Sequence, residues 1–84
     1  MRKIGMSGQV ERFLRTLPPE PRHRVRLAIS RLARDDTGTK ALKDELAGYR
    51  RIAVGKYRVI YLPYADGVEC VYAGPRKTIY KDFG

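Results

Sequence analysis

Two stretches in the first forty residues repeat apolar positions at the spacing of an α-helix. The first repeat consists of Val10, Phe13, Leu14 and Leu17, and the second consists of Val25, Ala28, Ile29 and Leu32. Ser7 stands where an N-cap residue is expected, and Pro18-Pro19 stops the first helix. An acid and a proline at Glu20-Pro21 open the second helix, which ends at the cluster Asp35-Asp36-Thr37-Gly38. The pattern predicts an antiparallel helical hairpin.

In the second half of the chain the apolar period changes from 3.6 to 2. In "GYRRIAVGKYRVIYLP" (Gly48–Pro63), basic or aromatic residues alternate with aliphatic ones on both sides of a break at Gly55-Lys56. We predict one strand before this break, a hairpin partner at Tyr57–Leu62, and a third strand in "VECVYA" after the turn Ala65-Asp66-Gly67. "MRKIGM" is compatible with a short edge strand, and "KALKDELAGY" with an irregular or briefly helical connection.

These elements predict an α+β domain of residues 1–84: a strand, two helices, and then three strands in an antiparallel meander. The helical hairpin covers one face of the sheet. The core between the two layers is expected to contain Val25, Ile29, Leu32, Ile52, Val54 and Ile60. Arg51 alternates with Ile52, so these two side chains should lie on opposite faces. The second face is expected to be open and to carry arginines.

Charge is the strongest compositional signal. The chain has 18 lysines and arginines against 9 acidic residues, a formal net charge of +9. So small a basic domain favours a polyanion or an acidic protein as its partner. Cys70 is the only cysteine and His23 the only histidine, which indicates a reducing cytoplasm and no metal site. No apolar run approaches the roughly 20 residues that span a bilayer, so we expect no membrane partner.

The strand motifs "LAGYRRIAVGKYRVIY" and "VECVYAGPRKTIY" resemble those of the RelE/ParE toxin superfamily. The helical segment "VERFLRTLPPEPRHRVRLAISRL" is similar to the N-terminal half of that family, so the resemblance covers nearly the whole chain. It implies a RelE-like βααβββ fold and a toxin without a cofactor, which a cognate antitoxin neutralises. The RelE branch cuts messenger RNA in the ribosomal A site, whereas the ParE branch inhibits DNA gyrase.

The resemblance also implies a site. Arg58 matches a phosphate-stabilising arginine, and Arg76 an arginine that stabilises charge and protonates the leaving group. Tyr80 matches a tyrosine that stacks on or orients a nucleotide, and Arg51 matches a basic strand position. Metal-free RNA cleavage by the 2′-OH needs such cations at the phosphate, and a guanidinium suits that role. Further RNA contacts are expected from Lys43, Lys56, Lys77 and Lys81, although no motif specifies them.

Two departures from the family pattern leave alternatives open. Ala53 stands where some members carry a second lysine, and Pro75 precedes Arg76 where others carry a histidine. The general base is therefore unassigned. The leading hypothesis is a ribosome-dependent mRNA endonuclease. The alternatives are a gyrase inhibitor of the ParE type and a degenerate member that only binds its antitoxin. The arginines are also compatible with ordinary solvent-facing strand positions, and Tyr80 with an anchor for the tail.

Overall fold

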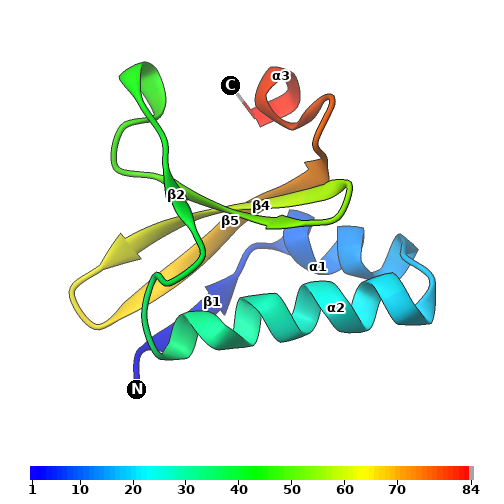
Figure 1. Ribbon diagram of the computed structural model, residues 1–84, viewed down its shortest axis with the longest axis horizontal. Helices are drawn as coiled ribbons and strands as arrows, with labels where there is room; N and C mark the ends of the chain where they lie inside the picture. The colour runs from blue at the N-terminus through cyan, green and yellow to red at the C-terminus, as the bar shows by residue number, and fades with distance from the viewer. Residues whose placement is uncertain (84) are drawn as a thin grey trace.

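The computed structural model describes residues 1–83 and has a five-stranded sheet with two long helices on one face (Figure 1). The strand order is β1-β5-β4-β3-β2. The strands are β1 (Lys3–Met6), β2 (Lys40–Ala41), β3 (Arg50–Val54), β4 (Tyr57–Tyr64) and β5 (Gly67–Pro75). The helices are α1 (Gly8–Thr16), α2 (Pro19–Ser30) and α3 (Ile79–Phe83), with 3-10 turns η1 at Arg31–Ala33 and η2 at Asp44–Leu46. The predicted α+β order is confirmed.

The predicted helical hairpin is present, although α2 begins at Pro19, one residue before Glu20, and ends at Ser30, from where the 3-10 turn η1 leads to the predicted end at Asp35. The Ser7 hydroxyl accepts a hydrogen bond from the Val10 amide at 3.2 Å, which satisfies one of the free amides in the first turn of α1. At the other end, the Arg22 side chain donates to the carbonyls of Leu14 and Leu17, at 3.1 and 2.8 Å. One α2 side chain thus caps the end of α1 and fixes the sharp connection between the helices. No helix within residues 1–83 has the length and apolar character needed to cross a membrane.

The sheet is mixed. The predicted antiparallel meander of β3, β4 and β5 is present, and Gly55, at a φ of +57°, allows the tight β3–β4 turn. The N-terminal strand β1 pairs in parallel with β5, and the two-residue β2 pairs antiparallel with β3. Strand β2 lies in the segment for which an irregular connection was predicted. Within the same segment, η2 agrees with the predicted brief helical turn.

The main core lies between the helices and the sheet, as predicted. Val25, Ile29, Leu32 and Ile52 are buried in it, and Val54 packs against it while partly exposed. The sheet adds Val59, Tyr61, Val68, Cys70 and Ala73, and α1 adds Val10, Leu14 and Leu17. Burial raises the pKa of the Cys70 thiol to about 12, which leaves it protonated and unreactive near neutral pH.

The placement of Ile60 in this core is wrong. Ile60 pairs with Arg51 across β3 and β4, so the two share the face away from α1 and α2. Ile60 and Ile79 are both fully buried, yet neither belongs to the main core. On this face Phe83 contacts the rings of Tyr49 and Tyr72, with centroid separations of 5.4 and 5.8 Å. A second, smaller apolar contact therefore forms under α3.

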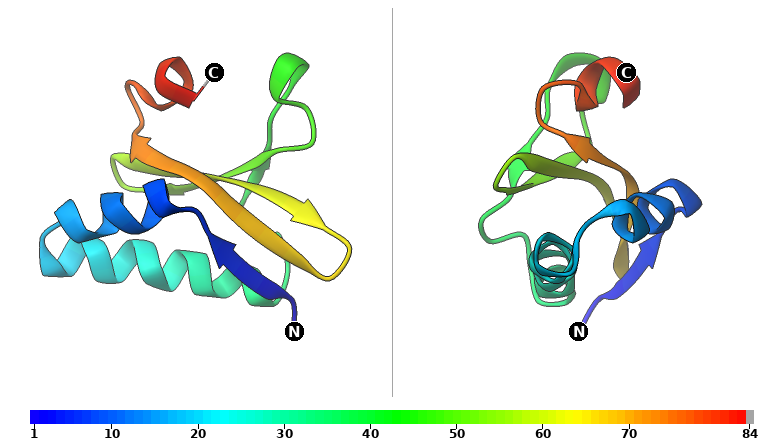
Figure 2. Two further views of the ribbon diagram at one scale, coloured as in Figure 1. Left: turned by 180° about the vertical axis from the view of Figure 1, so that it is seen from behind. Right: turned by 90° about the vertical axis from the view of Figure 1, so that its right-hand side faces the viewer.

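The face predicted to be open is thus covered in part. Helix α3 and the β2–β3 connection both stand on the side of the sheet opposite α1 and α2 (Figures 1 and 2). The sheet residues left between and beside them carry the arginines. Arg51 and Ile52 lie on opposite faces, so the predicted register of β3 is correct.

Candidate functional site

Two of the predicted site residues lie close together on the face that carries α3. Arg51 on β3 pairs with Ile60 on β4. Arg58 lies two residues before Ile60 and is therefore the diagonal neighbour of Arg51. Both arginines are half-buried. Arg58 lies between Ala53 on β3 and Gly74 on β5, its partners on either side. Neither partner has a side chain larger than a methyl group.

The β3–β4 turn brings Arg58 and Arg76 together. The Nη1 atom of Arg58 donates to the carbonyls of Gly55 and Tyr57, both at 2.8 Å. The backbone amide of Arg76 donates to the Lys56 carbonyl, also at 2.8 Å. Both arginines are therefore attached to the same turn, although 18 positions separate them in the chain. We call Lys56, Arg58, Arg76 and Lys77 the turn cluster.

Three members of the turn cluster, Lys56, Arg76 and Lys77, are open to solvent, and Arg58 is half-buried. A shallow pocket of about 300 Å³ is lined by Lys56, Pro75, Arg76 and Lys77, and all four residues are exposed. Within residues 1–83, the Arg76 and Arg51 side chains have no hydrogen-bond or ion-pair partner, and Arg58 keeps Nε and Nη2 free. A guanidinium presents its donors as a planar fork that fits a phosphate, so these free groups suit an RNA backbone.

The positive charge of this face is not neutralised by the protein. Within residues 1–83 the two ion pairs are Arg2–Asp36 at 2.8 Å and Lys3–Asp66 at 3.6 Å, and both lie near the N-terminus. The remaining lysines and arginines repel one another, and an anion bound among them relieves that repulsion. The site can therefore bind and stabilise negative charge.

The other predicted residues lie around this cluster. Tyr80 and Lys81 are on α3, where Tyr80 is 39% exposed and the neighbouring Ile79 is buried. Lys43 lies on the β2–β3 connection, at the end of β3 away from the Gly55-Lys56 turn. The structure thus brings Lys56 and Lys77 beside Arg76, next to the turn that holds Arg58, and places Tyr80 and Lys81 on α3 and Lys43 on the β2–β3 connection.

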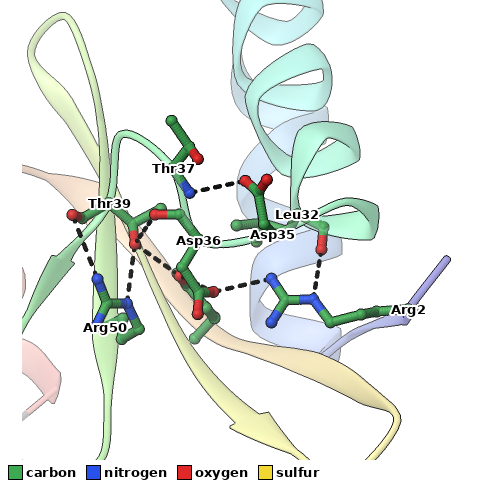
Figure 3. Close-up of polar contacts among 8 residues, drawn as sticks. Arg2, Leu32, Asp35, Asp36, Thr37, Thr39 and Arg50 are labelled. Carbon is green, nitrogen blue, oxygen red and sulfur yellow. Dashed lines mark hydrogen bonds and ion pairs between the residues drawn. The ribbon is translucent and has the colours of Figure 1, made fainter.

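A polar network on the opposite face of the sheet holds β2 beside β3 (Figure 3). The Tyr61 hydroxyl lies 2.8 Å from the Asp36 carboxylate and from the Thr39 hydroxyl. The Arg50 Nε atom donates to the Thr39 hydroxyl at 2.9 Å, and Arg2 donates to Asp36 at 2.8 Å. The bond from Arg2 keeps the pKa of Asp36 below its ordinary value, and burial raises the pKa of Tyr61. The network thus joins the N-terminus, the end of the helical hairpin, and strands β2 to β4.

The sequence motifs miss two elements of this region. Strand β2 is only two residues long, too short to show an alternating pattern. Helix α3 has one detectable signal, the apolar pair Ile79 and Phe83 at a spacing of four residues. Both elements border the arginines.

Solved structures resemble this chain over most of its length, whereas no family model and no curated protein sequence matches it. A chain of the toxin–antitoxin complex RelBE2 from Mycobacterium tuberculosis is 25% identical, with a TM-score of 0.79 over 89% of this chain and 98% of that one. A chain of the RelB–RelE antitoxin–toxin complex from Methanococcus jannaschii is 24% identical, with a TM-score of 0.74 over 95% and 99%. YafQ from E. coli is 18% identical, with a TM-score of 0.69 over the full length of both chains. The chain therefore has the fold of RelE-like toxins, which confirms the resemblance predicted from its strand motifs.

Proposed function

We propose that this protein is the toxin of a toxin–antitoxin pair and acts as a ribosome-dependent mRNA endonuclease. The observation that carries the proposal is the turn cluster, in which Arg58 and Arg76 are attached to the Gly55-Lys56 turn with free guanidinium donors. The RelE-like fold gives this cluster its context, because a chain of similar fold occurs in toxin–antitoxin complexes. The proposed place of action is the cytoplasm, where translation occurs.

In the proposed reaction the 2′-hydroxyl of the nucleotide before the cut attacks the adjacent phosphorus. The bond from phosphorus to the 5′ oxygen breaks, the 2′-hydroxyl loses its proton and the 5′ oxygen gains one, so the products carry a 2′,3′-cyclic phosphate and a 5′-hydroxyl. Negative charge builds up on the phosphate oxygens during attack, and the Arg58 Nε and Nη2 groups are free to donate hydrogen bonds to these oxygens. Arg76, exposed beside them, stabilises the same charge and faces the leaving oxygen.

The remaining residues position the RNA. Lys56 and Lys77 line the pocket beside Arg76 and bind neighbouring phosphates. Tyr80 offers an exposed ring on α3, on which a base can stack. Arg51 provides a further cation next to Arg58 on the sheet. Orientation on the ribosome and charge stabilisation together supply most of the rate in this proposal.

The proposed partner is a cognate antitoxin. Two of the structures with this fold are complexes of a toxin with its antitoxin. The formal charge of +9 favours an acidic segment as the binding partner. Such a segment, docked across the α3 face of the sheet or along the helices, would bury or displace the short helix that carries Tyr80.

The proposal is tested by incubating the purified protein with ribosomes programmed with a defined mRNA. We expect cuts confined to the A site, with a 2′,3′-cyclic phosphate and a 5′-hydroxyl at the new ends. The matched reaction contains gyrase and plasmid DNA in place of ribosomes, and we expect no inhibition of supercoiling. Intact mRNA together with inhibited gyrase would move the protein to the ParE type. Intact mRNA with active gyrase would leave an antitoxin-binding member without nuclease activity.

A further inference from the structure

Strand β2 places Lys40, a residue that the sequence motifs do not include, beside the candidate site. Lys40 lies directly opposite Arg51 in the antiparallel pairing of β2 with β3. Residues paired in this way project from the same face of a sheet, with Cβ atoms roughly 4.5–5.5 Å apart. Arg51 is in turn the diagonal neighbour of Arg58 across β3 and β4. Lys40, Arg51 and Arg58 therefore follow one another on three adjacent strands of one face.

The pair Lys40 and Arg51 is not compensated by the protein. Lys40 is exposed and Arg51 half-buried, and within residues 1–83 neither side chain takes part in a hydrogen bond or an ion pair. Like charges on directly opposed positions destabilise a sheet. A phosphate held between the two side chains would replace this repulsion by two attractions, each of them a charge-assisted hydrogen bond.

The network of Figure 3 maintains this pairing. Thr39, which precedes Lys40, is held by the Arg50 Nε atom at 2.9 Å and the Tyr61 hydroxyl at 2.8 Å. After β2, the Leu42 amide donates to the Tyr49 carbonyl at 2.9 Å. These bonds fix a strand of only two residues on both sides. Because Thr39 points to the core side of the sheet, Lys40 must project to the side of Arg51.

The neighbouring positions leave this location open to a ligand. Ala53, two residues beyond Arg51 on the same face of β3, has only a methyl group. Lys40 projects from the adjacent strand on the same face, so a second cation stands beside Arg51.

We propose that Lys40 and Arg51 together bind one phosphate of single-stranded RNA, next to the phosphate held by the turn cluster. This inference rests on the proposed function and extends its RNA site to the β2 edge of the sheet. The role is binding rather than bond cleavage, since the pair lies apart from the Gly55-Lys56 turn to which Arg58 and Arg76 are attached.

The test is a double-mutant cycle on RNA binding, measured without ribosomes. The probe is a short 2′-O-methyl RNA, which cannot be cut by 2′-OH attack. The variants are Lys40→Ala, Arg51→Ala, the double variant, Lys40→Arg, and Arg24→Ala as a control of equal charge change on the exposed side of α2. Affinity is measured between low and moderate salt, because each lost phosphate contact on a single strand lowers the salt slope by about 0.7.

Lys40→Ala should weaken binding by about three- to ten-fold at low salt and lower the salt slope by one contact. Lys40→Arg should restore most of the affinity. The double variant should lose less than the product of the two single losses, because both side chains bind the same phosphate. Arg24→Ala should change affinity by less than about two-fold. Independent effects of Lys40 and Arg51, a Lys40→Ala loss no larger than that of Arg24→Ala, or absence of RNA binding by the wild type would each overturn the inference.

The outcome is separable from that of the nuclease assay. If Lys40→Ala and Arg51→Ala are coupled in RNA affinity but the wild type does not cleave mRNA on ribosomes, the binding site of Lys40 and Arg51 is supported and the proposed reaction is wrong. Cleavage of mRNA on ribosomes with no coupling between Lys40 and Arg51 would do the reverse.

Discussion

At the scale of single residues, Asp36 is the acidic group on which most of the polar network depends. Its carboxylate accepts hydrogen bonds from Arg2 and from the Tyr61 hydroxyl, each at 2.8 Å. Arg2 also donates to the Leu32 carbonyl at 2.9 Å, so one side chain ties the N-terminus to the end of the helical region. These contacts stabilise the charged form of Asp36, and they lower its pKa in spite of partial burial.

This arrangement predicts a pH dependence of stability. A carboxyl group whose pKa is lowered on folding stabilises the protein above its unfolded pKa of about 3.9, and the effect disappears as the pH falls through the folded value. Asp36→Asn should therefore lower the free energy of unfolding at pH 7 by about 1 kcal/mol, a modest amount because the carboxylate is partly exposed. The difference between wild type and variant should shrink below about pH 4.

Urea unfolding of both proteins between pH 3 and pH 7 measures this difference. The Asp35 carboxylate accepts a hydrogen bond from the Thr37 amide, which lowers the pKa of Asp35 as well. The stability of the variant should therefore still fall in acid. The control is Asp82→Asn in α3, which leaves the Asp36 network intact and should follow the wild-type curve. A difference between wild type and Asp36→Asn that stays constant across this pH range would contradict the account of Asp36.

At the scale of elements, the periodic segments were predictable and the short ones were not. Apolar residues recur at helical spacing in α1 and α2, and residue types alternate along β3. Each of these patterns is several residues long and therefore identifies its element. In β4 the residues Val59-Ile60-Tyr61 are all apolar, so the sequence does not show which of them face the main core. Ile60 was assigned to the wrong layer because the cover on its own side, α3, was not expected. Strand β2 depends on the contacts of Thr39, which a sequence pattern does not contain.

Helix α3 should be able to unfold without the main core. It has five residues, and its aromatic contacts join Phe83 to Tyr49 and Tyr72. Ile79→Ala should therefore detach α3 and lower the global free energy of unfolding by no more than about 1–2 kcal/mol, because the main core stays intact. The same truncation at Ile29, which is 4% exposed in the main core, should cost about 2–5 kcal/mol.

Hydrogen exchange read by mass spectrometry, together with urea unfolding, separates the two variants. In Ile79→Ala the amides of α3 should exchange quickly while those of α1, α2 and β3–β5 keep their protection. Faster exchange across the whole sheet in this variant would mean that α3 is part of the main cooperative unit.

At the scale of the whole molecule, the fold separates two tasks between the two faces of one sheet. The face under α1 and α2 carries the main core, and the other face carries Arg51 and Arg58, which form no ion pair within residues 1–83. Arg51, Arg58 and Arg76 were candidate site residues because the strand motifs resemble those of the toxin family, and the register of β3 with β4 places Arg51 and Arg58 on one face of the sheet. The place of Lys40 was not predictable, since only the register of β2 brings it to Arg51. Under the proposed function, part of the net charge of +9 belongs to the surface that binds RNA.

In the proposed mechanism Arg58 and Arg76 stabilise the charge that develops on a scissile RNA phosphate. The most direct measurement is single-turnover cleavage of mRNA on programmed ribosomes by the wild type, Arg58→Ala, Arg76→Ala and the double variant, with a melting temperature for each. Either single change should slow cleavage by about 10²–10³, the loss expected for one donor to a developing oxyanion. Stability should change by less than about 0.5 kcal/mol for the exposed Arg76, and should fall by about 1 kcal/mol for Arg58, whose half-buried side chain donates to two carbonyls of the turn. Arg→Lys at either position should rescue only part of the rate, because an ammonium cannot make the bidentate contact. Undiminished cleavage by a folded double variant would contradict the account.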